Sequence, residues 1–333
     1  MGRMIGLMGT LGLLSVCVMV SACTPARTAS TNATPQRQAV TIVPDHIVPL
    51  WQGAAPGSPE ILPKEEIVFR ANAFGLVDRA AHNVAIPSVS VFKASNPNGG
   101  AILIIPGGGY SWVVIDKEGY ESASFFTRRG YDVYVLRYRL PHQNWQSGPD
   151  TPLQDAQRAI RYIRSLNPTQ KVMVMGFSAG GHVAGTLAAK YDQAVSTTPR
   201  DDLSQLSARP DVSVLMYPVV TMTRPFAHAK SRENMIGAVP SDSDIARHSL
   251  ETSPNPNTPP TFILHASDDE AVKIENATML FETLRRAKVP VAFHAFEKGG
   301  HGFGMRGISG TPLQAWPDMV LAWATSHGFP APN

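Results

Sequence analysis

The segment around Ser178 constrains the fold more than any other part of the sequence. An apolar run, Lys171–Met175, leads directly into Gly-Phe-Ser-Ala-Gly at 176–180, and apolar residues at helical spacing follow over Ala179–Lys190. This order predicts a buried strand, a sharp turn and a helix. The turn strains the backbone of Ser178, so the residues two before and two after it must lack side chains. The Ser178 hydroxyl is then expected at a helix N-terminus, where amide donors and the helix dipole favour negative charge.

Strand-like and helix-like segments alternate along most of the chain. Apolar runs rich in β-branched residues predict strands at Ser88–Lys93, Ala101–Ile105, Asp132–Arg137, Lys171–Met175, Asp211–Met216, Thr261–Ala266 and Val291–Phe296. Apolar residues at three- and four-residue spacing predict helices at Glu121–Arg129, Pro152–Ser165, Ala179–Lys190, Glu275–Ala287 and Leu313–Ser326. The alternation predicts an α/β fold with a mostly parallel central sheet and helices on both faces.

Two stretches depart from this alternation. The first strand-like segments, Glu66–Arg70 and Ser88–Lys93, have no helical pattern between them, so we expect them to form an antiparallel edge. Residues 219–258 are the least regular stretch, and we expect a cap or long loop over the site there. We find no internal repeat, and residues 41–333 are therefore predicted to form one domain.

The composition argues against nucleic acid as a partner. Of the 333 residues, 43% are hydrophobic, an ordinary fraction for a protein with a globular core. Charged residues make up 17%, and the net charge is +3. The two longest basic clusters, Arg158–Arg161–Arg164 and Arg285–Arg286–Lys288, have spacings that suit solvated helix faces. No basic block stands out, so we do not expect nucleic-acid binding.

The N-terminus has the pattern of an export signal. Residues 1–22 carry one charge, Arg3, followed by an apolar run and small residues before Cys23. This break resembles the lipobox of bacterial lipoproteins, in which the cysteine becomes the lipidated first residue. We therefore expect a membrane anchor at Cys23 and a flexible tether over residues 23–40. Thr24, by resemblance to sorting in Gram-negative bacteria, points to the outer membrane or periplasm. An ordinary signal peptide with an incidental cysteine is the alternative.

The two cysteines leave no thiol in the predicted mature chain. Cys17 lies in the signal, and Cys23 would carry the lipid. We therefore expect no disulfide, no cysteine nucleophile and no cysteine-based zinc site. The size of the core has to provide the stability of the exported domain.

A glycine run upstream of Ser178 is suited to binding an anion. Ile104-Ile105-Pro106 closes a predicted strand, and three glycines and a tyrosine follow. Such a run lets backbone N–H groups converge on one point, as an oxyanion hole requires. We assign the amides of Gly108 and Gly109 from this loop, together with that of Ala179, to an oxyanion hole. A simple flexible turn is the alternative.

An acid and a histidine follow in the order that a serine nucleophile requires. The strand Thr261–Ala266 ends in an acidic turn, where Asp269 lies three residues before Val272; Asp268 is the second choice. The next strand leads to His301, which has glycines on both sides, as a mobile proton carrier would. The chain order Ser178, Asp269, His301 is that of the α/β-hydrolases.

The other histidines have structural interpretations. We expect His182 to pack behind Ser178, and His265 to be a core histidine bonded to backbone; His142, His228 and His248 fall in loops without an acidic neighbour. No metal-ligand spacing is present, and we expect no metal and no cofactor. Tyr110, Trp112 and Trp145 are candidates for lining an acyl or sugar pocket, with ordinary packing as the alternative.

Several motifs together resemble one family. They are Pro106-Gly-Gly-Gly-Tyr110, Glu118-Gly119, Tyr138-Arg139, Asp155 with Ala159-Ile160-Arg161, Gly176–His182 and Pro259–Phe262, with Val48–Trp51 and Ala55–Gly57 near the start. They resemble the bacterial acetyl esterase/lipase group of α/β-hydrolases, in the branch of carbohydrate acetylesterases, over residues 46–330. Pro106 departs from relatives of the hormone-sensitive-lipase type, which have histidine before the glycines. The resemblance implies an α/β-hydrolase fold and deacetylation of plant cell-wall glycans such as xylan.

These features predict a lipid-anchored, exported serine esterase. We expect it to hydrolyse short-chain acyl esters, above all acetyl esters, and the substrate to be an acylated carbohydrate or a small ester. Ser178 would be the nucleophile, His301 the proton carrier and Asp269 the acid that orients it. A serine peptidase or amidase on the same fold is one alternative. A surface lipoprotein that binds without catalysis is the other.

Overall fold

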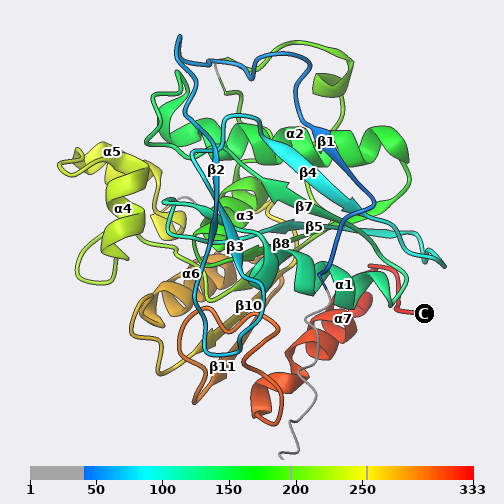
Figure 1. The fold of residues 1–333 in the computed structure, drawn as a ribbon. Coiled ribbons are helices and arrows are strands. Elements are labelled where there is room, and N and C mark those ends of the chain that lie inside the picture. Colours follow the sequence, from blue (N-terminus) through cyan, green and yellow to red (C-terminus); the bar gives the residue numbers. More distant parts are fainter. Residues whose placement is uncertain (1–40, 196, 253) are drawn as a thin grey trace, which may run out of the picture. The chain divides into compact units, whose positions relative to one another are not determined.

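The computed structural model describes residues 41–333 except 196 and 253. Its centre is an eight-stranded sheet that is mostly parallel (Figure 1). In spatial order the strands are β1 (His46–Pro49), β4 (Ser88–Phe92), β7 (Asp132–Arg137), β5 (Gly100–Ile105), β8 (Lys171–Phe177), β9 (Val212–Met216), β10 (Thr261–Ala266) and β11 (Val291–Phe296). Only β4 breaks the parallel order, because it is antiparallel to both β1 and β7. The predicted α/β fold is confirmed.

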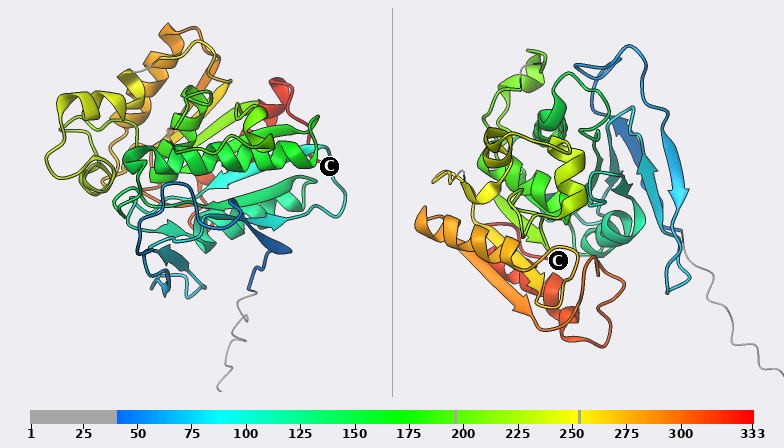
Figure 2. Two further views of the ribbon diagram at one scale, coloured as in Figure 1. Left: turned by 90° about the horizontal axis from the view of Figure 1, so that it is seen from above. Right: turned by 90° about the vertical axis from the view of Figure 1, so that its left-hand side faces the viewer.

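Helices cover both faces of this sheet. Against one face pack α2 (Thr151–Leu166), α3 (Ala179–Ala189) and α6 (Glu275–Arg286); against the other pack α1 (Glu121–Thr127) and α7 (Trp316–Ser326). The left view of Figure 2, from above, shows α2 lying over the sheet. The five helices predicted from the sequence lie within a few residues of these bounds.

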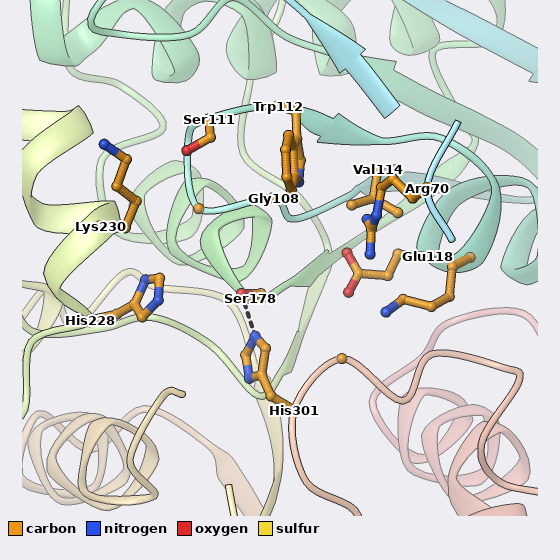
Figure 3. Close-up of a pocket in the computed structure, with 13 residues that line it drawn as sticks. Arg70, Gly108, Ser111, Trp112, Val114, Glu118, Ser178, His228, Lys230 and His301 are labelled. Carbon is orange, nitrogen blue, oxygen red and sulfur yellow. Dashed lines mark hydrogen bonds between the residues drawn. The ribbon is translucent and has the colours of Figure 1, made fainter. Parts of the chain in front are cut away.

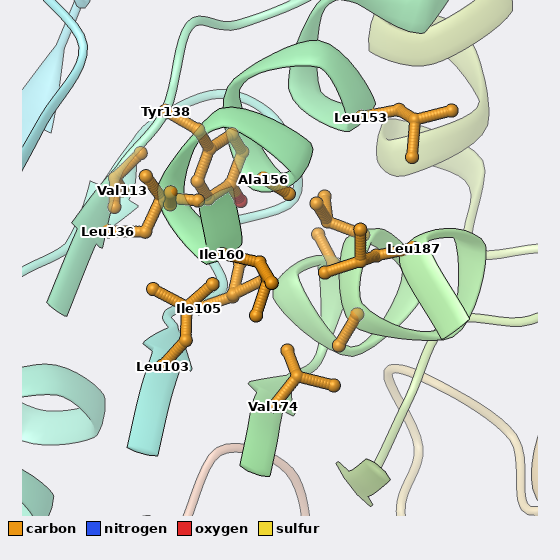
Figure 4. Close-up of a cluster of buried hydrophobic side chains, with 14 of the residues drawn as sticks. Leu103, Ile105, Val113, Leu136, Tyr138, Leu153, Ala156, Ile160, Val174 and Leu187 are labelled. Carbon is orange, nitrogen blue, oxygen red and sulfur yellow. The ribbon is translucent and has the colours of Figure 1, made fainter. Parts of the chain in front are cut away.

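The two cores follow from the alternation of side chains along each buried strand. In β5, Leu103 and Ile105 face the core under α2 and α3, whereas Ile102 and Ile104 face the core under α1 and α7. Figure 4 shows the first of these cores, where side chains of β5 and β8 meet those of α2 and α3. Both faces of the parallel strands are buried, which explains their uninterrupted apolar sequences.

The expected antiparallel edge is wrong in its pairing. The strand β2 (Glu66–Phe69) does not pair with β4 but belongs to a second sheet with β3 (Arg79–His82) and β6 (Val113–Val114). The neighbour of β4 is instead β1, which the sequence analysis did not predict. Every residue of β2 is at least partly exposed, so its apolar residues do not make it a core strand.

Residues 219–258 are more regular than expected. They contain α4 (Ala229–Ile236) and α5 (Asp242–Arg247), which project from one side of the domain in Figure 1 and in the left view of Figure 2. Both helices begin at capping side chains, His228 for α4 and Ser241 for α5. Their apolar faces are too short for the spacing of apolar residues in the sequence to predict these two helices.

Five short helical turns complete the described part of the chain. One is a π-helical turn, η1 (Asp116–Tyr120), directly before α1; the others are 3₁₀ turns, η2 (Gly148–Asp150), η3 (Asp202–Gln205), η4 (Leu250–Thr252) and η5 (Pro312–Ala315). A π-helical turn is uncommon and often lies at a functional site. Here it carries two residues of the cavity described below.

One basic cluster is not the solvated face that its spacing suggests. On α2, Arg158 donates to the carbonyl of Leu50, Arg161 to that of Leu206 and Arg164 to that of Arg209. These arginines therefore fasten surface loops to the helix. The second cluster fits the prediction in α6, where the side chains of Arg285 and Arg286 are exposed.

The predicted signal, the lipidated Cys23 and the tether over residues 23–40 lie outside the described residues. Among the residues that are described, no helix is both long enough and apolar enough to cross a membrane.

Candidate active site

Ser178 stands in the sharp turn between β8 and α3. Its backbone has φ 54° and ψ −119°, a strained conformation for a residue with a side chain. The flanking glycines allow it, because a Cβ on Gly176 would lie 2.2 Å from the carbonyl oxygen of Gly180. A Cβ on Gly180 would lie 2.1 Å from the carbonyl oxygen of Ile105. The turn is the one that the sequence predicts, and steric contacts explain both glycines.

A chain of hydrogen bonds links Ser178 to two residues from other loops. The Oγ of Ser178 lies 2.8 Å from Nε2 of His301 (Figure 3), and Nδ1 of His301 lies 2.7 Å from Oδ2 of Asp269. Because a carboxylate only accepts, Nδ1 carries the hydrogen and Nε2 is free to accept from the serine. The structure thus brings together the three residues that the sequence analysis singled out.

Asp269 is held as an anion by several donors. Its Oδ1 accepts from the amides of Ala271 and Val272 at 3.0 and 2.9 Å. Burial alone would raise the pKa of Asp269, but hydrogen bonds from His265 and His301 and the nearby charge of His301 outweigh it and hold the pKa well below its usual value. The carboxylate is therefore ionised at neutral pH.

Asp268, the second choice for the acid, has a different position. Its Oδ1 accepts from the amide of Gly300 at 2.8 Å, so it fixes the loop that carries His301. The ring of Tyr217 packs edge-on against the imidazole of His301, with centroids 5.1 Å apart. The histidine loop is thus supported on two sides.

His265 is closer to the site than the sequence analysis expected. It is fully buried in β10, and its Nε2 lies 2.8 Å from the carbonyl oxygen of Val272 and 3.2 Å from Oδ2 of Asp269. The predicted backbone bond is present, but the contact with Asp269 was missed. Strand alternation does not reveal it, because the contact depends on how the following loop folds back.

The glycine loop presents amides to the cavity. Gly108 and Gly109 line the cavity with φ of 133° and 62°, and the amide of Gly107 donates to Oε2 of Glu118 at 2.7 Å. None of the hydrogen bonds among the described residues uses the amides of Gly108, Gly109 or Ala179. These are the three donors that the sequence analysis assigned to an oxyanion hole.

Glu118 is a functional candidate that sequence reasoning passed over. It lies on η1 with 3% of its surface exposed, and its two oxygens accept from the Gly107 amide and, at 3.1 Å, from the Tyr217 hydroxyl. It therefore joins the glycine loop to the residue that supports His301. The only sequence signal was the Glu-Gly pair among the family motifs.

A cavity of about 480 Å³ opens above Ser178. It is lined by Arg70, Gly108, Gly109, Ser111, Trp112, Val114, Lys117, Glu118, Ser178, His228, Lys230, His301 and Gly302. Of the three aromatic candidates only Trp112 lines it; Tyr110 and Trp145 are buried in the core. Residues 219–258 contribute His228 and Lys230, so this segment forms one wall.

His228 has a defined orientation in that wall. Its Nδ1 accepts from the amide of Ser231 as the cap of α4, so the neutral ring carries its hydrogen on Nε2. Burial lowers the pKa of His228, with a further contribution from nearby His301. The neutral ring is therefore favoured near neutral pH. No acidic residue lies near His228 in the sequence, so the pattern did not mark it as a site residue.

His182 packs behind the nucleophile turn, as expected. Its Nε2 lies 2.7 Å from the carbonyl oxygen of His248, and its Nδ1 lies 2.7 Å from the hydroxyl of Tyr110. Because a carbonyl only accepts, Nε2 carries the hydrogen and Nδ1 accepts from the tyrosine. Complete burial lowers the pKa of His182 to about 3, so this ring stays neutral.

Within the described ranges, no three histidine, cysteine or acidic side chains are grouped as metal ligands.

The fold is that of the α/β-hydrolases. Solved structures share this architecture, including a carboxylesterase from Lactobacillus plantarum with a TM-score of 0.60 at 21% identity, which covers 80% of this chain and all of that one. Residues 91–284 match the BD-FAE family. The chain belongs to this family.

Three similar proteins have informative names. Endo-1,4-beta-xylanase B of Butyrivibrio fibrisolvens is 38% identical over 207 residues, 60% of this chain and 32% of that protein. Acetylxylan esterase of Xylanibacter ruminicola is 31% identical over 224 residues, 64% of this chain and 43% of that protein. The acetyl ester-xyloside bifunctional hydrolase of Caldicellulosiruptor lactoaceticus has a TM-score of 0.69 at 28% identity, covering 88% of this chain and all of that one.

The chain therefore spans less than half the length of the two curated relatives. The family expected from the sequence motifs is confirmed.

Proposed function

We propose that the protein is a serine esterase that hydrolyses short acyl esters of carbohydrates, with acetylated xylan as the representative substrate. The observation that carries the proposal is the hydrogen-bonded series Ser178, His301 and Asp269 beside unused amides in one cavity. Membership of the BD-FAE family supports ester hydrolysis. The names acetylxylan esterase and acetyl ester-xyloside hydrolase of two similar proteins support a glycan acetyl ester as substrate.

In the first half of the reaction, the Oγ of Ser178 attacks the ester carbonyl carbon while its proton passes to Nε2 of His301. The oxygen that becomes negative is stabilised by the amides of Gly108, Gly109 and Ala179. Asp269 holds the hydrogen on Nδ1 and stabilises the imidazolium that forms. The C–O bond to the sugar then breaks, and the leaving oxygen takes the proton from Nε2.

In the second half, water replaces the sugar. It loses a proton to Nε2 of His301 and attacks the acyl carbon on Ser178, so that the same amides stabilise the second oxyanion. Collapse releases acetate and returns the proton to Oγ of Ser178. The strained turn at Ser178 holds its side chain at the cavity for both attacks.

The test is acetate release from acetylated xylan by the full chain and by Ser178→Ala. We expect release by the wild type and a loss of about 10³-fold or more in the variant. Ser326→Ala, at an exposed serine at the end of α7, is the matched control and should match the wild type. A wild type that hydrolyses 4-nitrophenyl acetate but not xylan would contradict the glycan substrate. Inactivity on both would favour a binding protein.

We further propose that residues 1–22 are removed as a signal, that lipid on Cys23 anchors residues 41–333 through a tether to the outer membrane, and that the enzyme is exported. The supporting observation is the small-residue sequence before Cys23. Radiolabelled palmitate should enter the wild type and Cys17→Ser in a Gram-negative host, but not Cys23→Ser. Labelling of Cys23→Ser would contradict the anchor.

A further inference from the structure

The cavity at Ser178 is surrounded by more positive than negative side chains. Arg70, Lys117 and Lys230 line it, against the single carboxylate of Glu118. Figure 3 shows Lys230, from α4, on one side of Ser178 and Arg70 on the opposite side. A ligand in the cavity therefore lies between positive charges that come from different parts of the chain.

The carboxylates near the cavity are buried and occupied. Glu118 accepts from the Gly107 amide and the Tyr217 hydroxyl, and only 3% of it is exposed. Asp269, also 3% exposed, accepts from His301, His265 and two amides. These anions are used in holding the site together, so the solvent-facing charge of the cavity is positive.

Lys117 lies next to the reacting residues. A Cβ placed on Gly302 would lie 3.1 Å from its Nζ, so the ammonium group is adjacent to the residue that follows His301. In the described part of the chain Lys117 forms no ion pair, and ion pairs are formed by other lysines. An ammonium group in this position can meet a substrate anion close to the scissile ester.

The other two cations have only weak partners. The guanidinium of Arg70 lies 3.6 Å from Asp78, which it shares with Arg306 at 3.7 Å. Lys230 lies 3.4 Å from Glu233 on the exposed surface of α4, an arrangement that contributes little stability. Both cations are therefore available to a bound anion.

We propose that the preferred substrate carries a carboxylate close to the ester, as in a glycan with uronic acid branches. This proposal rests on the proposed esterase function. The cavity of about 480 Å³ is far larger than an acetyl group requires, so most of it is available to the sugar portion. The carboxylate is accordingly placed on the alcohol part of the ester, where Lys117, Arg70 and Lys230 can reach it.

The test compares two fractions of acetylated xylo-oligosaccharides, with and without a uronic acid branch, separated by anion exchange. We expect kcat/KM to be about tenfold higher for the acidic fraction at low salt, and this ratio to fall as salt screens the charges. In the triple variant Arg70→Gln/Lys117→Gln/Lys230→Gln the ratio should approach one. Lys64→Gln, at an exposed lysine outside the cavity, should keep the wild-type ratio.

The outcomes separate this proposal from the proposed function. Equal kcat/KM on both fractions, or a preference that survives in the triple variant, overturns the proposed preference for an acidic substrate but leaves the proposed esterase activity intact. Failure to hydrolyse either fraction overturns both. A parallel comparison of 4-nitrophenyl hydrogen succinate with 4-nitrophenyl acetate locates the carboxylate. A lysine-dependent preference for the succinate, with none for the acidic glycan, would move the carboxylate to the acyl part and overturn the proposal.

Discussion

Replacing Asp269 with asparagine should leave the fold intact but force His301 into the wrong tautomer. Oδ1 of Asp269 accepts from the amides of Ala271 and Val272, so an asparagine must keep its carbonyl oxygen on that side. Its NH₂ group then faces Nδ1 of His301, 2.7 Å away in the wild type, and donates to it. The imidazole must carry its hydrogen on Nε2, where it can no longer accept the proton of Ser178.

The expected loss follows from this tautomer. A serine hydrolase with the wrong histidine tautomer loses a factor of about 10⁴ in kcat, or about 5 kcal/mol of transition-state stabilisation. We therefore expect Asp269→Asn to lower kcat for 4-nitrophenyl acetate by about 10⁴-fold, with a small change in KM. The new NH₂ group also faces the Nε2–H of His265, which was bonded to the carboxylate. This conflict should lower the urea midpoint as well.

Asp268→Asn is the matched control. The asparagine oxygen can still accept from the amide of Gly300, so kcat should stay within about fivefold of the wild type. A kcat of Asp269→Asn within tenfold of the wild-type value would show that Asp269 does not set the tautomer of His301. A larger loss of kcat in Asp268→Asn would assign the role of the acid to Asp268.

Three further changes test the supporting structure. Glu118→Gln replaces the charged acceptor of the Gly107 amide with a neutral one, so kcat should fall by about 10- to 100-fold with little change in KM. An unchanged kcat would show that Glu118 does not support the glycine loop. Gly180→Ala should lower the free energy of unfolding in urea by more than about 3 kcal/mol, because its Cβ would lie 2.1 Å from a carbonyl oxygen. In the control Gly307→Ala, the new Cβ would meet nothing closer than 3.6 Å, so the free energy of unfolding should stay within about 0.5 kcal/mol of the wild-type value. The pKa of His182 is about 3 in the folded protein, below the ordinary histidine value of about 6.5. The unfolded state therefore binds more protons between these pH values, and stability falls as the pH drops through them. His182→Gln keeps a hydrogen-bond donor and an acceptor but does not titrate. Between pH 7 and 5 the free energy of unfolding of the wild type should therefore fall by about 2 kcal/mol more than that of the variant. Equal falls would contradict the buried neutral ring.

The parts of the fold that the sequence predicts well are those set by local patterns. The strand before Ser178, the turn and α3 follow from an apolar run, two glycines and a helical period. The longer strands of the central sheet were found for the same reason. By contrast, β1, β3 and β6 have only two to four residues, too few for alternation to be distinguished from chance.

The unpredicted parts of the site depend on contacts between distant residues. Glu118 acts on Gly107 and Tyr217, and Tyr217 lies 99 residues further along the chain. The spacing of Arg158 predicts a solvated position on the helix, but its side chain donates to the carbonyl of Leu50, 108 residues away. No periodicity encodes such pairs, because the fold must exist before they meet. Ser178, Asp269 and His301 were found because the type and order of these residues are themselves the signal.

Ser178 should carry the acyl group during the reaction. Mixing the His301→Ala variant and the wild type with acetylated xylo-oligosaccharides, quenching in acid and mapping peptides by mass spectrometry tests it directly. We expect an acetyl group on the wild-type peptide that contains Ser178, and none on the same peptide of the variant. Acetate release with no acetyl-Ser178 at any quench time, or acetylation of a different residue that turns over at the rate of catalysis, would contradict it.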